Sequence, residues 1–334
     1  MSNLIKIAVD AMGGDGSPKK IVDGIIDNHK SSKENFYRIF GNKDKIESLI
    51  RGKVDKNFYE IVHTQDIVKS TDSPLEAAKR GKKTSMWLSI ESVKNKESDI
   101  VISAGNTGAL LVIAKLNLKM LENIDKPALS ALWPNKKGMS VVLDLGANIE
   151  CSSKNLVDFS IMGASLYKSL YPSDTPNVAL LNIGSEELKG NEIIKETFQK
   201  LNERKNSNFE FSGYIEGNEL MNGNVNVIVS DGFTGNVALK TAEGTANFIT
   251  DELKKALSGS LLGKISSLLN ISNLKKFKKR LDPRLYNGAI FIGLDTAVVK
   301  SHGGTDYIGF SNSLNVCNRI IKGNLIDKIK GNIL

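Results

Sequence analysis

Six short loops rich in glycine, asparagine and aspartate constrain most strongly what this chain can fold into. They span residues 10–16, 103–109, 144–148, 183–191, 231–236 and 301–305. Most of them directly follow a short run of β-forming residues, and a helical pattern follows most of them. Strand, loop and helix in alternation are typical of a mostly parallel sheet that is covered by helices on both faces. We therefore expect an α/β protein.

The order of the predicted elements is consistent with one domain. Strands are predicted at 4–9, 36–40, 59–63, 100–103, 140–143, 178–183, 209–211, 225–230 and 289–292. Pro18 opens one helix, and Ser73 opens another as a capping box that runs towards Val93. Further helices are predicted at 106–120, 155–170, 191–201 and 233–257. Because no linker or repeat divides the chain, we expect a single three-layer α/β/α domain over 1–334, with residues 254–284 projecting from it.

Loops of this kind favour anions, because they present free backbone N–H groups and the positive end of a helix dipole. Ligands of such sheets bind outside the carboxyl ends of the strands. Five of the six loops are predicted there, and residues 301–305 join them only by folding back. The dinucleotide and Walker fingerprints are absent, and so is the nucleophile elbow of hydrolases. We therefore expect one shared crevice that handles phosphate.

Composition excludes several other classes. Hydrophobic residues make up 40% and charged residues 25%, as in a soluble globular protein. Two cysteines are too few for a disulfide framework, and neither they nor the three histidines have the spacing of a zinc site. The first residues lack a signal-peptide pattern, and no apolar run is long enough to span a membrane. We expect a cytoplasmic protein without a dedicated zinc site.

Three residues are the strongest candidates for catalysis. Lys189 precedes a glycine at a helix start, where its charge can hold phosphate or the developing negative charge. The alternative for Lys189 is a solvated surface lysine. Asp231 and Asn236 follow a buried strand and can orient the reacting groups, although an aspartate there often only caps the next helix.

Other loop residues are candidates to line the same crevice, with helix capping as the alternative for many of them. Cys151 is better explained as a packed thiol than as a nucleophile, because no histidine partner is evident. The predicted substrate or phosphate ligands are Asp10, Gly14, Asp15, Asn106, Thr107, Asp144, Asn148, Glu187 and His302.

Taken in order, these loops resemble one family, the bacterial phosphate acyltransferases of phospholipid synthesis. The similarity is carried by residues 9–15, 103–109, 143–148 with Cys151, 181–191 and 231–244. The resemblance implies transfer of an acyl group from acyl-acyl carrier protein to phosphate, giving acyl phosphate. It also implies a homodimer without a metal or an organic cofactor. The implied architecture is similar to isocitrate and isopropylmalate dehydrogenases and to phosphate acetyltransferase. The alternatives are a phosphate acetyltransferase-like enzyme that uses acyl-coenzyme A, and a non-catalytic adaptor of membranes or carrier protein.

The chemistry permitted by these residues is compatible with that reaction. Phosphate is largely ionised near neutral pH and needs little help from a base. The thiol released from a thioester has a pKa of about 8.5, so it needs only a weak acid. Direct attack therefore requires positioning and charge stabilisation more than a catalytic triad.

Residues 254–284 hold nine lysines and arginines and one acid, which accounts for the whole formal net charge of +8. An amphipathic helix followed by a polybasic run is typical of a membrane-surface element. The alternatives are a dimer interface, a helix packed on the core, or a contact with acidic carrier protein; nucleic acid is disfavoured. We expect peripheral binding to the inner face of the cell membrane, near the membrane acyltransferase that uses the product. The predicted membrane contacts are Leu261, Leu262, Ile265, Leu268 and Leu269.

Overall fold

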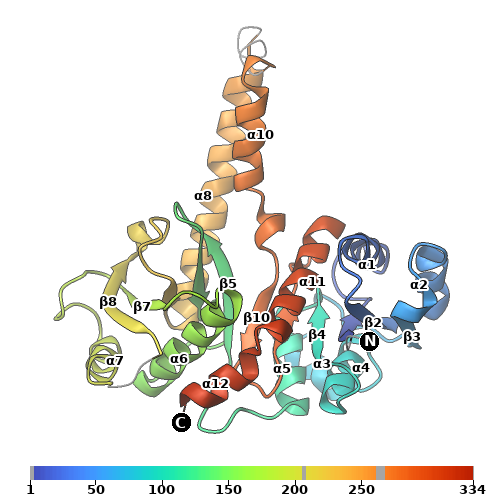
Figure 1. Ribbon diagram of the computed structural model, residues 1–334, viewed down its shortest axis with the longest axis horizontal. Coiled ribbons are helices and arrows are strands. Elements are labelled where there is room, and N and C mark those ends of the chain that lie inside the picture. The colour runs from blue at the N-terminus through green and yellow to red at the C-terminus, as the bar shows by residue number, and fades with distance from the viewer. Residues whose placement is uncertain (1–3, 205–207, 261–267, 334) are drawn as a thin grey trace.

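The computed structural model describes residues 4–204, 208–260 and 268–333. An eleven-stranded sheet runs through the chain in the order β3-β2-β1-β4-β11-β10-β5-β6-β9-β7-β8, and Figure 1 shows the strands side by side. The strands are β1 (Ile5–Asp10), β2 (Asn35–Gly41), β3 (Tyr59–His63), β4 (Ile100–Ser103), β5 (Ala128–Pro134), β6 (Met139–Leu143), β7 (Asn177–Asn182), β8 (Glu210–Glu216), β9 (Val227–Val229), β10 (Ala289–Ile292) and β11 (Val298–Lys300).

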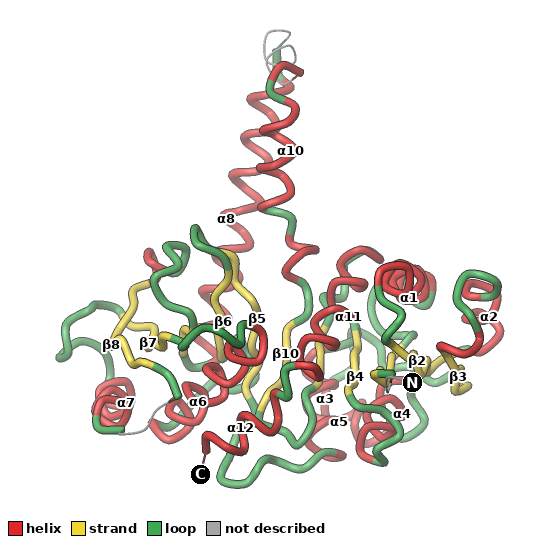
Figure 2. Tube along the Cα trace, viewed as in Figure 1, coloured by secondary structure: helices red, strands yellow, loops and turns green. Residues whose placement is uncertain are grey.

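Helices cover both faces of this sheet (Figure 2). One apolar cluster joins the sheet to α1, α2, α6, α7, α11 and α12, and a second joins it to α3, α4, α5 and the start of α8. Alternate residues of β1 belong to different clusters, as the two-residue period of a strand requires. The helices are α1 (Lys19–Ser31), α2 (Lys43–Ile50), α3 (Pro74–Arg80), α4 (Ser85–Lys94), α5 (Thr107–Asn117), α6 (Ser153–Leu170), α7 (Glu192–Asn202), α8 (Gly232–Ser258), α10 (Ile271–Arg280), α11 (Tyr307–Lys322) and α12 (Leu325–Ile333).

The predicted three-layer α/β/α architecture is confirmed, and each of the nine predicted runs forms a strand. The sequence analysis missed β5 and β11. Pro127 precedes β5 and Pro134 ends it, and proline normally argues against a strand inside a sheet. β11 contains only three residues and one of them is a lysine, so it lacks the longer β-type run that revealed the equally short β9.

The helix predicted from Ser73 towards Val93 is wrong as one element, because the chain forms α3 and α4 instead. The Ser73 hydroxyl accepts the Glu76 N–H, so the predicted start is correct. Gly81 ends α3. Thr84 then begins a new helix by accepting the N–H of Trp87.

Strand direction reverses in the middle of the sheet. β1, β4 and β11 are parallel to one another, and so are β6, β9 and β7. Between these two groups, the pairings β11–β10, β10–β5 and β5–β6 are all antiparallel. Three successive reversals leave the two groups pointing in opposite directions. Their carboxyl ends therefore lie at opposite edges of the sheet, here called the β1/β4/β11 edge and the β6/β7/β9 edge.

A two-helix arm projects from the body of the molecule (Figure 1). We define the helical arm as the described residues between Glu243 and Arg280. Ala238, Leu239 and Ala242 of α8 still contact the core, whereas the only buried residues of α8 are Gly232 and Gly235, and α10 has none. The projection thus begins earlier than the predicted residue 254. The alternative of a helix packed on the core is wrong for this part of the chain.

The arm leaves from the β1/β4/β11 edge. After α10 the chain passes through a short turn of helix (Pro283–Tyr286) into β10, whose first residue, Ala289, pairs with Lys300 at the end of β11. At the foot of the arm, the Arg280 guanidinium donates to the backbone carbonyl of Asn135. Among the described helices, none is both long and apolar enough to cross a membrane.

Candidate active site

The six loops form two sets, one at each edge of the sheet. The loops at 10–16, 103–109 and 301–305 follow β1, β4 and β11, and those at 144–148, 183–191 and 231–236 follow β6, β7 and β9. Residues 301–305 follow a strand directly, so the expectation that they only fold back is wrong. The expected single crevice is also not formed within one chain, because the strand reversal separates the two sets.

Asp144 organises the β6/β7/β9 edge. Its side chain is fully buried, and burial raises its pKa while hydrogen bonds oppose that rise. One carboxylate oxygen accepts the N–H groups of Leu129, Gly146 and Ala147 at 2.9–3.1 Å. The other accepts the backbone N–H and the side-chain amide of Asn148, both at 2.8 Å. Asp144 and Asn148, both predicted ligands, are therefore hydrogen-bonded to each other and fix the conformation of the loop at 144–148.

Asp231 and Asn236 lie at the start of α8, against the same loop. Asp231 caps α8 by accepting the backbone N–H and the hydroxyl of Thr234, both at 2.8 Å. The Asn236 amide donates to the carbonyl of Leu145 at 3.1 Å. A Cβ on Gly235 would lie 2.0 Å from the Asp144 carbonyl oxygen, so only glycine lets the helix approach this closely.

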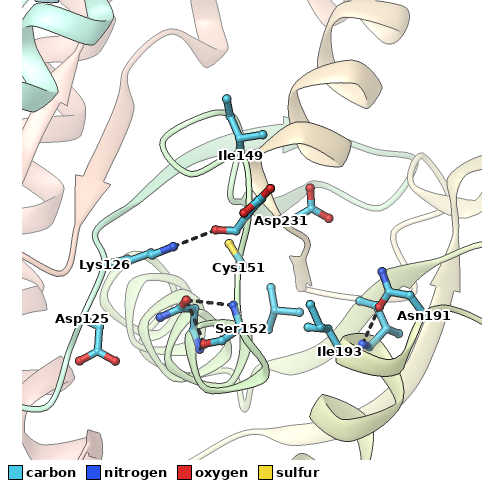
Figure 3. A pocket seen from close by; sticks show the side chains of 12 residues that line it. Asp125, Lys126, Ile149, Cys151, Ser152, Asn191, Ile193 and Asp231 are labelled. Atoms are coloured by element: carbon cyan, nitrogen blue, oxygen red, sulfur yellow. Dashed lines mark hydrogen bonds between the residues drawn. The ribbon is translucent and has the colours of Figure 1, made fainter.

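A pocket of about 780 Å³ opens at this edge (Figure 3). Asp231, Lys126 and Asn191 contribute polar groups, and the aliphatic side chains on its walls could accommodate an apolar tail. Lys189 and Glu187 lie in the loop that leads to Asn191, and both are exposed. The twelve lining residues are Asp125, Lys126, Ile149, Glu150, Cys151, Ser152, Asn155, Leu156, Asn191, Ile193, Ile194 and Asp231.

Cys151 lines this pocket but is poorly suited to nucleophilic attack. Burial first, and the charge of Asp144 second, raise the pKa of its thiol to about 11. The reactive thiolate is therefore scarce at neutral pH. The arrangement supports the interpretation of Cys151 as a packed thiol.

Asp10 is the centre of the β1/β4/β11 edge. It is buried, and its carboxylate accepts the hydroxyls of Ser85 and Ser103 at 2.6 and 2.7 Å and the N–H of Met12 at 3.2 Å. Burial raises its pKa, and these hydrogen bonds oppose the rise. Asp10 pairs with Ser103 across the strands, and Ser103 pairs with Lys300. These three side chains therefore share one register and one face of the sheet.

Glycines allow the three loops of this edge to touch. The Asp15 N–H donates to the Gly303 carbonyl at 3.1 Å. Gly14 has φ +84°, and a Cβ there would lie 2.8 Å from the carbonyl of Ala104. His302 is exposed, and its Nδ1 accepts the N–H of Gly304 at 3.2 Å. Partial desolvation of its ring, and then the charge of Lys300, lower the pKa of His302.

Asn106 and Thr107 begin α5 at the same edge. The Asn106 side-chain oxygen accepts the Ala109 N–H at 3.0 Å. Asn106 therefore caps α5, which is the alternative role given for these loop residues. Its amide also donates to the carbonyls of Ser70 and Asp72, which fixes the loop before α3. Thr107 is exposed beside it.

Two lysines at this edge were missed by the sequence analysis. Lys20 and Lys300 are only 9% and 8% exposed. Burial first lowers the pKa of both side chains, that of Lys300 to about 8. Lys300 ends a strand that was not predicted, and Lys20 looked like one of many surface lysines after Pro18.

A catalytic role for Lys189, Asp231 and Asn236 stays a prediction.

Solved structures with a similar fold include phosphotransacetylases and 4-hydroxythreonine-4-phosphate dehydrogenases. Structural similarity extends to a phosphotransacetylase from Streptococcus pyogenes, with a TM-score of 0.62, 14% identity and coverage of 98% of this chain and 95% of that one. It also extends to the EutD phosphotransacetylase from Staphylococcus aureus, with a TM-score of 0.61, 14% identity and coverage of 96% and 94%. At such low identity these matches show the fold alone, an α/β fold that phosphotransacetylases and these dehydrogenases share.

Sequence comparison is more specific. Residues 5–328 match the family described as "Fatty acid synthesis protein". The chain is 77% identical to a phosphate acyltransferase from Pelagibacter ubique over the full length of both, and 45% identical to one from Rhodospirillum rubrum, covering 100% of this chain and 95% of that one. The chain belongs to this family, that of the bacterial phosphate acyltransferases, and is an enzyme of the acyltransferase class.

Proposed function

We propose that this chain transfers a fatty acyl group from acyl-acyl carrier protein to inorganic phosphate, giving acyl phosphate for phospholipid synthesis. The main support is the full-length identity of 77% to a protein named phosphate acyltransferase. The loops at the carboxyl ends of the strands supply the backbone N–H groups and lysines that a phosphate requires. The family description, fatty acid synthesis, favours a fatty acyl donor.

The reaction needs few catalytic groups. An oxygen of HPO₄²⁻ attacks the thioester carbonyl, and the carbon–sulfur bond breaks as the new carbon–oxygen bond is completed. The phosphate proton ends on the thiolate, so the products are the acyl phosphate dianion and the free carrier thiol. The enzyme's contribution is to hold phosphate beside the carbonyl and to stabilise the oxyanion.

The nature of the donor is tested by comparing two thioesters of the same fatty acid. Purified protein is incubated with phosphate and either acyl-carrier protein or acyl-coenzyme A, and acyl phosphate is trapped as the hydroxamate. We expect kcat/KM to be higher by at least about 10-fold with the carrier, because the basic arm can steer an acidic protein. Equal or better use of coenzyme A would support the phosphate acetyltransferase-like alternative.

We further propose that the arm attaches this cytoplasmic protein to the inner face of the membrane. Leu268 and Leu269 near its tip are 69% and 81% exposed. The predicted contacts Leu261, Leu262 and Ile265 lie outside the described residues. Five basic residues of α10 add attraction of about 1 kcal/mol each near anionic lipid; they are Lys275, Lys276, Lys278, Lys279 and Arg280.

Membrane binding is measured by co-sedimentation with anionic vesicles. We expect Leu268→Glu/Leu269→Glu to lose most of its binding, because two charges would replace the inserted apolar groups. Leu116→Glu is the control, since Leu116 is 61% exposed but lies on α5, away from the arm. Binding of native protein should also weaken with salt. Equal sedimentation of the double variant and the native protein would rule out this part of the arm as the anchor.

A further inference from the structure

Two buried lysines from different elements reach the same loop at the β1/β4/β11 edge. Lys300 is the last residue of β11, and its ammonium donates to the carbonyl of Ser301. Lys20 comes from α1, and its ammonium donates to the carbonyl of Gly303 at 2.5 Å. Both residues are more than nine-tenths buried, and their ammonium groups lie beside residues 301–303.

Neither lysine is neutralised by a direct contact with a described residue, although the charge of Asp15 attracts Lys20. Neither forms an ion pair with a carboxylate in the described part of the chain. Asp10 attracts Lys300, but its oxygens are occupied by the hydroxyls of Ser85 and Ser103. The two ammonium groups also repel each other. A buried cation without a counter-ion is costly, so an anion would stabilise this arrangement.

The three loops pack closely against one another beside these lysines. A Cβ on Gly13 would lie 2.7 Å from Asp10 Oδ2 and 2.7 Å from the Gly105 nitrogen, and one on Gly303 would lie 3.4 Å from the Ala104 carbonyl. Three strand ends therefore meet without side chains between them. The charges of Glu243 and Lys240 act on His302, so His302 lies near the part of α8 where the arm begins.

We propose that Lys20 and Lys300 form the binding site of the phosphate nucleophile, here called the seat. A tetrahedral dianion can accept from both ammonium groups at once, replacing two backbone carbonyls as acceptors and neutralising both charges. The assignment rests on the proposed function for the identity of the anion. It also separates the seat from Lys189, which lies in a loop at the opposite edge. Acyl phosphate would then form at the edge from which the arm projects.

The seat is tested by calorimetric titration of the full chain with inorganic phosphate, without any acyl donor. We expect saturable binding by the native protein and binding that is about 10- to 100-fold weaker for Lys20→Met and for Lys300→Met, since each loses a charged hydrogen bond. Lys19→Gln is the matched control. Lys19 is the neighbour of Lys20 on α1, but it is exposed and paired with Asp23. Native-like phosphate affinity in Lys300→Met would overturn the proposal.

Thermal unfolding distinguishes a ligand seat from a structural cluster. In phosphate-free buffer we expect Lys300→Met to melt at the same temperature as the native protein or above it, because a buried charge is replaced by an apolar side chain. Phosphate should raise the Tm of the native protein but not that of the variant. A lower Tm of the variant in phosphate-free buffer, with an unchanged response to phosphate, would show that Lys300 is structural.

Steady-state kinetics identifies which phosphate occupies the seat. For the nucleophile, Lys20→Met should raise the KM for inorganic phosphate about 10-fold or more and leave the KM for the acyl donor unchanged. A raised KM for the acyl-carrier alone would place the phosphodiester of the carrier's prosthetic group there and overturn the proposal. Because the titration uses no donor, phosphate binding without acyl phosphate formation would instead refute the proposed function and leave the seat intact.

Discussion

Replacement of Asp144 by alanine is expected to lower the free energy of unfolding by at least about 3 kcal/mol. The carboxylate is fully buried and accepts five hydrogen bonds, four of them from backbone N–H groups. Without it, buried donors lose their partner, and each unsatisfied group costs about 1–3 kcal/mol. Urea unfolding measures the change directly.

Two further variants show whether that loss is specific. Asp144→Asn should be nearly as destabilising, because its NH₂ group would face N–H donors in place of an acceptor. Asp251→Ala on the exposed arm should change stability by no more than about 0.5 kcal/mol. A loss of less than 1 kcal/mol in Asp144→Ala, together with a loss of turnover, would favour the predicted role as a substrate ligand over a role in holding the loop.

Phosphate binding is expected to weaken about tenfold for each pH unit above about 8. Burial first lowers the pKa of Lys300 to about 8, the charge of Lys20 lowers it further, and Asp10 opposes both. His302, the other titratable neighbour, has a lowered pKa and is neutral in this range. Above pH 8 the free protein has lost the Lys300 proton, so binding of the dianion must take one up.

Loss of the Lys300 proton weakens phosphate binding, but it makes the folded chain without phosphate more stable. Between about pH 8 and the ordinary lysine value of 10.5, the unfolded chain keeps the proton that the folded chain has lost. The unfolded state then binds more protons, so stability in phosphate-free buffer rises with pH across this range. Titrations and urea unfolding at pH 7–10 measure both trends, and Lys300→Met should lack both. A phosphate affinity that stays constant from pH 7.5 to 9.5 would contradict the account.

Much of the fold could be predicted because the signals are local. Buried strands such as β1 are short apolar runs, and helix starts carry side chains such as Ser73 and Asn106 that bond to backbone N–H groups two or three residues on. β5 and β11 escaped prediction because proline and extreme shortness conceal a strand whose pairing is set by distant partners. Their absence from the prediction also concealed the reversal of strand direction.

The candidate site was predicted less completely for the same reason. The glycine and asparagine loops were found, but their division between two edges depends on the antiparallel pairings of β5 and β10. Lys20 and Lys300 carry no local signal, since a lysine becomes a buried cation only through what packs over it. Conversely, Asp10 and Asp144 are recognisable in the sequence, but only the fold shows that their oxygens are already occupied by neighbouring donors.

The account is tested most directly by following labelled phosphate oxygen into the product. Purified protein is mixed with fatty acyl-carrier protein and phosphate that carries ¹⁸O at all four positions, and the products are analysed by mass spectrometry. Direct attack predicts acyl phosphate that retains all four labelled oxygens, formed together with an equal amount of free carrier thiol. Absence of acyl phosphate, or release of free fatty acid in its place, would contradict the account.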